Sequence, residues 1–369
     1  MATSIDGVSP AFIRYLFFSA LLFGSGDLCH DSVPGIYILG DSLVDVGNNN
    51  YLSSILKADF PHNGVDFPTR QATGRFSNGK NAADFIVEKV GLPMAPPYLS
   101  LESEAKKLAC NNVTVTGVNF ASGGAGILNE TNEVFQLISL TKQVEYYSQV
   151  HDQLVQQLGS YGAENHLAKS LFLIVIGTND HFAYYNKDSQ VEKQYTPRQY
   201  IDLLISTLRL LMKRLYELGA RKFVVTGVGM IGCCPIQRLQ NTTNGCMVDT
   251  NYWSMEYNKG LKILLEELKG EAKDINYSYF DTYAAMSELL QDLQNYGIME
   301  IKEACCGLGN LKAEIPCIPV SNYCSNRSDY LFWDLYHPTE MVSRIFADLL
   351  YNGSRKFTLP VNVEQLVNM

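Results

Sequence analysis

The stretch YILGDSLVDVGNNN, Tyr37–Asn50, joins a short apolar run to a polar turn. The apolar run stops at Gly40, and Asp41 and Ser42 follow it directly. Ser42 has two competing interpretations, because a serine that follows a strand is commonly a helix N-cap but can also be a nucleophile. A nucleophile needs a base and an orienting group, so residues elsewhere in the chain must decide between the two.

Similar apolar runs recur along the chain and alternate with segments of helical spacing. The predicted strands are Gly35–Leu39, Val115–Phe120, Leu171–Ile176, Lys222–Thr226 and Asn276–Phe280, and the predicted helices are Asn81–Val90, Thr141–Leu158, Pro197–Leu218, Asn251–Leu268 and Tyr283–Gln294. This alternation indicates an α/β fold with a parallel sheet of about five strands and helices on both faces. Ligands bind such sheets beyond the carboxyl ends of the strands, which is where Ser42 is expected.

The composition is that of a globular protein, with 46% apolar and 18% charged residues among 369. The formal net charge of −9 argues against binding to nucleic acid or to an anionic membrane surface. The apolar segment Tyr15–Gly24 is shorter than the ~20 residues of a membrane-spanning helix. It fits a secretory signal peptide, with an ordinary N-terminal helix as the alternative. We therefore expect a signal peptide over residues 1–26, a single domain over residues 27–369 and no transmembrane segment.

The cysteines also favour a secreted protein. Seven of the nine lie between Cys233 and Cys324, and none forms the Cys-x-x-Cys spacing typical of zinc sites. Disulfides are therefore expected between Cys233 or Cys234 and Cys246, and between Cys305 or Cys306 and Cys317 or Cys324. The odd count leaves at least one thiol. Six Asn-x-Ser/Thr acceptors would permit N-glycosylation, at Asn112, Asn129, Asn241, Asn276, Asn326 and Asn352.

One glycine pattern imitates a nucleotide-binding motif. Gly227, Gly229 and Gly232 have the G-x-G-x-x-G spacing and follow a predicted strand. The motif must open a helix that holds a pyrophosphate, whereas here Pro235 follows almost at once. We interpret these glycines as a tight loop and expect no cofactor to bind there.

The partners of a nucleophilic serine can be found at other strand ends and in one C-terminal loop. Asp334 and His337 are three residues apart, so that the carboxylate can accept a hydrogen bond from Nδ1 and leave Nε2 for a substrate. The alternative is that both residues merely cap the last helix. His181 also follows a predicted strand and remains a second candidate. Asn179 offers a side-chain amide, and the SGGAG segment offers backbone N–H groups, as donors to an oxyanion.

The blocks GDSLVDVGNNN, GVNFASGGAGIL, IGTND and YLFWDLYHPTE, in this order, resemble the plant-type GDSL esterases/lipases, a branch of the SGNH hydrolases. The resemblance runs over nearly the whole chain after the signal-like segment. It implies a flavodoxin-like sheet, no metal and no cofactor. By the family pattern the catalytic residues are Ser42, Asp334 and His337, and the oxyanion hole is formed by Ser42, Gly124 and Asn179, although Gly123 and Gly126 are easily confused with Gly124.

The expected function is therefore that of a secreted serine ester hydrolase, extracellular and in the cell wall or apoplast by family resemblance. Its substrate would be a small-molecule, lipid or polysaccharide ester, cleaved through an acyl-enzyme. One alternative is an acyltransferase of the same fold with an alcohol as acceptor. Another is a secreted lipid- or glycan-binding protein without catalysis. A monomer is our working expectation.

Overall fold

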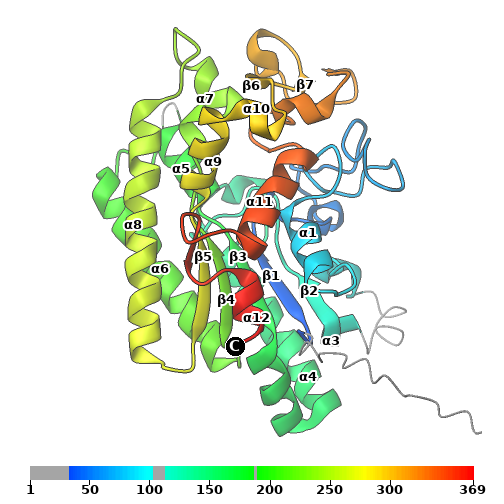
Figure 1. Ribbon diagram of the computed structural model, residues 1–369, viewed down its shortest axis with the longest axis vertical. Coiled ribbons are helices and arrows are strands. Elements are labelled where there is room, and N and C mark those ends of the chain that lie inside the picture. Colours follow the sequence, from blue (N-terminus) through cyan, green and yellow to red (C-terminus); the bar gives the residue numbers. More distant parts are fainter. Residues whose placement is uncertain (1–32, 103–112, 187–188) are drawn as a thin grey trace, which may run out of the picture. The chain divides into compact units, whose positions relative to one another are not determined.

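The computed structural model describes residues 33–102, 113–186 and 189–369. Within these ranges one sheet has the strand order β10-β5-β4-β3-β1-β2 (Figure 1). Its strands are β1 (Ile36–Gly40), β2 (Gly117–Asn119), β3 (Leu171–Val175), β4 (Lys222–Thr226), β5 (Asn276–Phe280) and β10 (Thr358–Pro360). The first five are parallel in the flavodoxin-like order 2-1-3-4-5, and β10 pairs antiparallel with β5. The predicted fold class is thus confirmed, and the expected signal peptide lies outside the described residues.

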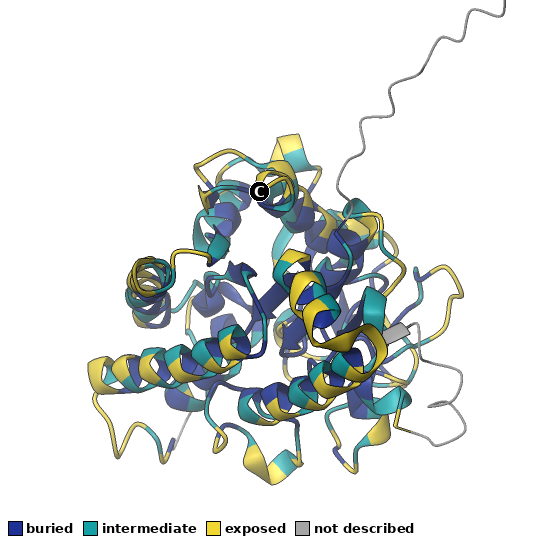
Figure 2. Cartoon of the chain, turned by 90° about the horizontal axis from the view of Figure 1, so that it is seen from below, coloured by how far each residue is buried: buried dark blue, intermediate teal, exposed yellow. Residues whose placement is uncertain are grey.

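Alternate side chains of each strand point to opposite faces, so the sheet has two apolar faces. Helices cover both of them. Tyr37 and Leu39 of β1 belong to a core that contains residues of three long helices, α4 (Leu140–Lys169), α6 (Pro197–Glu217) and α8 (Val248–Glu271). Ile36 and Ile38 belong to the core on the other face, with α1 (Ala82–Lys89), α11 (Glu340–Asn352) and α12 (Val363–Val367). Figure 2 shows the buried strands between helices whose outer sides are exposed.

The helices begin where the sequence provides caps. At the start of α6, Thr196 accepts a hydrogen bond from the N–H of Gln199, the Gln199 side chain accepts from Thr196, and Pro197 takes the first position. Shorter helices are α3 (Val113–Thr116), α5 (Thr178–Tyr185), α7 (Pro235–Leu239), α9 (Thr282–Gln291) and α10 (Leu293–Tyr296). Short 3-10 helices lie at Asn48–Tyr51, Tyr98–Ser100, Glu133–Phe135, Ile231–Cys233, Asn310–Lys312 and Arg327–Asp329. No helix in the described part of the chain is long and apolar enough to cross a bilayer.

Two disulfides stabilise the segment between β5 and α11, and a third closes the loop between β4 and α8. Two small sheets form there, one from β6 (Glu300–Ala304) and β9 (Tyr330–Phe332), the other from β7 (Cys306–Gly307) and β8 (Asn322–Tyr323). The structure resolves the pairings that the sequence left open, as Cys233–Cys246, Cys305–Cys324 and Cys306–Cys317. Cys234 is a free, buried thiol. Because β9 leads directly into the turn with Asp334 and His337, the bridges Cys305–Cys324 and Cys306–Cys317 fix the approach to that turn.

Candidate active site

Ser42 lies in a tight turn at the carboxyl end of β1. The N–H of Asp41 donates to the carbonyl of Val175 on β3 over 3.0 Å, and the carbonyl of Asp41 accepts from Val44 and Asp45 over 3.2 and 3.0 Å. The turn is therefore fixed to the sheet on one side and closed by its own backbone on the other. The Ser42 side chain is mostly buried, at 9% exposure. Its hydroxyl turns toward a histidine that lies 295 positions further along the chain.

That histidine is His337, and the carboxylate behind it is Asp334. Nε2 of His337 lies 2.7 Å from Oγ of Ser42, and Nδ1 lies 2.8 Å from both carboxylate oxygens of Asp334. In a neutral imidazole only one ring nitrogen carries hydrogen, so an Nδ1–H donated to Asp334 leaves Nε2 to accept from the serine. The N-cap of α11 is Thr339, whose hydroxyl accepts from Val342. The alternative that Asp334 and His337 serve as helix caps is therefore wrong.

Gly124 and Asn179 lie beside the serine and line the same cavity. Gly124 has a φ of 84°, a conformation that strains any other residue, and a Cβ there would also come within 2.6 Å of a Leu137 methyl and 2.7 Å of a Leu56 methyl. Asn179, near the start of α5, donates one amide hydrogen to the carbonyl of Ala125 over 2.9 Å. This bond holds the side chain in place and leaves its second amide hydrogen for another acceptor.

The cavity around Ser42 has a volume of about 350 Å³ and a mixed lining. Apolar walls come from residues such as Leu56, Phe76, Phe135 and Phe182, and polar side chains from Asn132, Asn186, Gln237 and Gln240. Such a cavity accommodates a molecule with both apolar and hydrogen-bonding parts.

The chain matches the GDSL-like Lipase/Acylhydrolase family over residues 36–350. It is 45% identical to the GDSL esterase/lipase At5g55050 of Arabidopsis thaliana, with 96% of this chain and 95% of that protein covered. It is 41% identical to the GDSL esterase/lipase At3g50400 of the same plant, with 89% and 90% covered. The chain belongs to the GDSL esterase/lipase family. It is thus a member of a family of carboxylic ester hydrolases, as the sequence motifs predicted.

Among solved structures, this GDSL esterase/lipase is similar to Axe2, an acetylxylan esterase from Geobacillus stearothermophilus. The match covers 86% of this chain and 93% of Axe2, at 15% identity and a TM-score of 0.38.

Two buried aspartates of this GDSL esterase/lipase hold the glycine segment against the serine turn. Asp45 accepts from the N–H of Gly123 over 3.0 Å with one carboxylate oxygen, and from Gly47 and Asn48 over 2.7 and 2.8 Å with the other. Asp45 therefore occupies the N–H of Gly123, which makes that group unavailable to an oxyanion.

The second aspartate is Asp180, which holds the far end of the same segment. It accepts from the N–H of Ile127 over 2.9 Å and from the hydroxyl of Thr131 over 2.6 Å. Burial raises the pKa of Asp180 to about 6 and that of Asp45 also to about 6, while their N–H donors oppose the shift. Gly124 therefore lies in a loop fixed at both ends.

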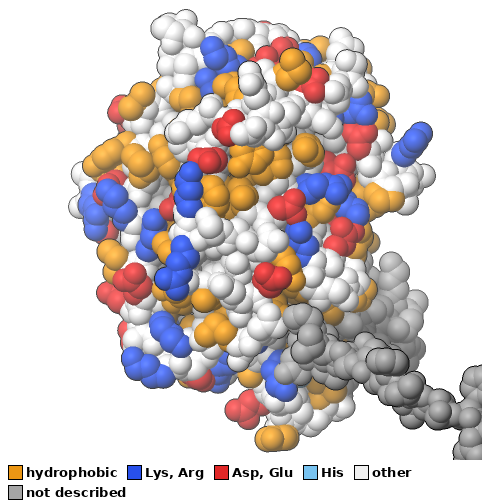
Figure 3. All heavy atoms as spheres, viewed as in Figure 1, with side chains coloured by type: hydrophobic (Ala, Val, Ile, Leu, Met, Phe, Trp, Pro, Cys, Tyr) orange, Lys and Arg blue, Asp and Glu red, His pale blue; other side chains and the backbone are white. Residues whose placement is uncertain are grey.

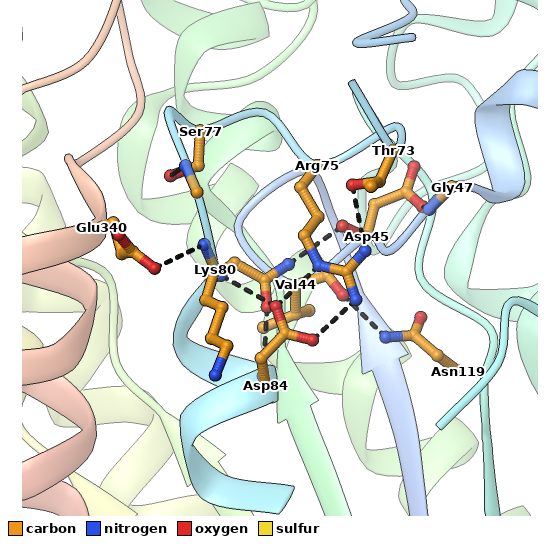
Figure 4. Close-up of polar contacts among 12 residues, drawn as sticks. Val44, Asp45, Gly47, Thr73, Arg75, Ser77, Lys80, Asp84, Asn119 and Glu340 are labelled. Carbon is orange, nitrogen blue, oxygen red and sulfur yellow. Dashed lines mark hydrogen bonds and ion pairs between the residues drawn. The ribbon is translucent and has the colours of Figure 1, made fainter. Parts of the chain in front are cut away.

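A buried ion pair stabilises the loop that carries Phe76. Arg75 binds both carboxylate oxygens of Asp84 over 2.6 and 2.7 Å and reaches the hydroxyl of Thr73 over 3.0 Å, as Figure 4 shows. The adjacent Phe76 ring packs against the imidazole of His337, with ring centroids 5.1 Å apart. The pair thus anchors the residue that covers one side of the imidazole.

His181, the other histidine candidate, is not among the residues that line the cavity. Its Nδ1 is bonded to the carbonyl of Gly177 over 2.8 Å, and its ring packs edge-on against Tyr257. Burial lowers the pKa of His181 to about 4, so it stays neutral near neutral pH. The structure thus brings Ser42, Gly124, Asn179 and His337 to one cavity, with Asp334 behind His337, and His181 is not among the residues that line it. The sequence reasoning missed Asp45, Asp180 and Phe76, although the first two lie inside the quoted GDSLVDVGNNN and IGTND motifs.

Proposed function

We propose that this protein is a secreted serine esterase in which Ser42 is the nucleophile, His337 the general base and acid, and Asp334 the orienting carboxylate. The observation that supports it most strongly is the 2.7 Å contact between Ser42 Oγ and His337 Nε2, with Asp334 2.8 Å behind Nδ1. A serine hydroxyl is a weak nucleophile at neutral pH and requires such a base.

The reaction follows from these positions. Nε2 of His337 takes the proton of Ser42 as Oγ bonds to the ester carbonyl carbon, and Asp334 stabilises the resulting imidazolium. The N–H groups of Ser42 and Gly124 and the free amide hydrogen of Asn179 donate to the oxyanion. The tetrahedral intermediate expels the alcohol, which takes the proton from His337. Water then attacks the acyl-enzyme by the same route, releasing the acid and restoring Ser42.

Three disulfides favour an oxidising compartment, which supports secretion. The acceptors Asn129, Asn326 and Asn352 are exposed and open to glycosylation. We therefore propose that residues 1–26 are a signal peptide and that residues 27–369 form a single, monomeric hydrolase domain. The family resemblance favours the cell wall or apoplast as its location.

The test is the hydrolysis of p-nitrophenyl esters from acetate to palmitate by the wild type, Ser42→Ala and Ser206→Ala. Ser206 is exposed on α6, so its variant is the matched control. We expect Ser42→Ala to lose at least ~10³ in kcat and Ser206→Ala to lose nothing. Equal rates for wild type and Ser42→Ala would overturn the proposal. Ester products formed in preference to acid when an alcohol is added would instead identify an acyltransferase.

A further inference from the structure

A second cavity of about 120 Å³ lies beside the active site, between the sheet and the helices α9 and α11. Its walls include Val175 of β3, Phe280 of β5, Met286 of α9, and Phe346 and Leu350 of α11. Among the described residues that line it there is no Asp, Glu, Lys, Arg or His. Figure 3 shows hydrophobic side chains gathered on the face that α9 and α11 form in Figure 1. The cavity therefore suits an apolar group.

This apolar cavity adjoins the catalytic one. Leu43, Thr178 and Tyr336 line both of them. Each of the three is the chain neighbour of a proposed catalytic group, since Leu43 follows Ser42, Thr178 precedes Asn179 and Tyr336 precedes His337. These three side chains form the wall that the two cavities share, so an acyl chain bound at Ser42 meets them before it enters the apolar cavity.

We infer that the apolar cavity binds the acyl chain of the ester, so that the substrates of this enzyme are medium- or long-chain fatty-acyl esters. The inference rests on the proposed function, because it needs the ester carbonyl at Ser42. Each methylene that leaves water for an apolar site favours binding about fourfold. An acetyl group is too short to pass the shared wall, whereas the acyl chain of a fatty ester is long enough to extend beyond it. The alcohol part stays in the mixed cavity, near side chains such as Gln237 and Asn186.

Gly229, on the loop after β4, offers a way to fill the cavity without touching the catalytic residues. It lines the cavity, and a Cβ there would meet Met286 Sδ and Thr282 Cγ2 at 3.5 Å each, which is ordinary contact. Gly229→Ala therefore fits and is the matched control, whereas Gly229→Leu occupies space in the cavity. Thr282→Leu is a second filling variant, because the buried Thr282 hydroxyl has no hydrogen-bond partner within the described chain.

We expect Gly229→Leu to lower kcat/KM for p-nitrophenyl dodecanoate at least tenfold and to change that for the acetate ester less than twofold. For Gly229→Ala, the ratio of the dodecanoate kcat/KM to the acetate kcat/KM should stay close to the wild-type ratio. The acetate rate also reports folding, and Thr282→Leu gives the same comparison if Gly229→Leu does not fold. An unchanged dodecanoate-to-acetate ratio in a folded filling variant would overturn the inference, provided that Ser42→Ala abolishes both activities.

A binding measurement separates the cavity from the chemistry. Three proteins are titrated with cis-parinaric acid, a fluorescent fatty acid. They are Ser42→Ala and the two double variants that carry Gly229→Leu or Gly229→Ala in addition. We expect Gly229→Leu to weaken binding at least tenfold and Gly229→Ala less than twofold. Equal affinity in all three proteins would refute the acyl site even if Ser42 proves to be the nucleophile. Hydrolysis that survives Ser42→Ala would refute the proposed function instead.

Discussion

Nδ1 of His337 lies 2.8 Å from both carboxylate oxygens of Asp334, and the two residues belong to one turn. One of those oxygens also accepts the backbone N–H groups of Tyr336 and His337, over 2.9 Å each. The carboxylate therefore shapes the turn and orients the imidazole at the same time. The three-residue spacing allows both, because the chain folds back on itself between them.

Replacing Asp334 with asparagine tests this relationship. The amide has one oxygen where the carboxylate has two, and it removes the negative charge that favours imidazolium. We expect kcat to fall by ~10³–10⁴ with little change in KM, measured by steady-state hydrolysis of a p-nitrophenyl ester. Asp348→Asn on α11 is the control, because its carboxylate is about half exposed and pairs with Lys89 at the surface. Activity within tenfold of the wild type would show that Asp334 does not orient the base.

Asn179 provides a second prediction, on the oxyanion. One hydrogen of its amide is bonded to Ala125, so the side chain is already held when a substrate arrives. We expect Asn179→Ala to lower kcat by ~10²–10³, because the oxyanion loses one fixed donor. Asn186→Ala, which changes another amide of the same cavity, should lower kcat less than fivefold. If the two variants lose equal activity, Asn179 contributes to binding in general and not to the transition state.

Asp45 is predicted to be a positioning residue. Its carboxylate accepts from Gly47, Asn48 and Gly123, whereas the single oxygen of an asparagine cannot serve all three donors. We expect Asp45→Asn to lower the free energy of unfolding by about 1–3 kcal/mol and to reduce kcat more than it raises KM. Urea denaturation and ester kinetics measure the two effects. A loss of stability with unchanged kcat would mean that the glycine loop keeps its position without Asp45.

Most of the fold could be predicted because its strands are local apolar runs. The central strands β1, β3 and β4 are largely buried and mostly apolar, as predicted. Of the predicted strand Val115–Phe120 only Gly117–Asn119 form β2, since Val115 and Thr116 belong to α3. The edge strand β10 was missed, because its three residues include an exposed Leu359 and end at Pro360. The serine, histidine and acid were found from motifs. The supporting contacts were not, since Asp45 meets Gly123 78 positions away and Asp180 meets Ile127 53 positions away.

The last prediction concerns Asp41, which is buried beside Ser42. One carboxylate oxygen accepts from the N–H of Leu43 over 3.0 Å, and the other has no hydrogen-bond partner among the described residues. Burial raises the pKa of Asp41 from 3.8 to about 7, against the opposing effects of the Leu43 N–H and the nearby His337. The folded protein therefore holds this proton more tightly than the unfolded chain does.

The sign of the pH effect follows from that difference. Stability from a protonated Asp41 is fully present below about pH 4 and is lost as the pH rises toward 7, where the folded state must bury a charge. Asp41→Asn keeps an oxygen for Leu43 but has no proton to lose. The free energy of unfolding of Asp41→Asn minus that of the wild type should therefore be smallest at pH 4. This difference should grow up to pH 7 and then stay constant. Urea denaturation from pH 4 to pH 8 measures this difference, and the contribution of the raised Asp45 pKa cancels because both proteins contain that residue. A difference that stays flat, or that shrinks with rising pH, would show that Asp41 is ionised in the folded enzyme well below neutral pH.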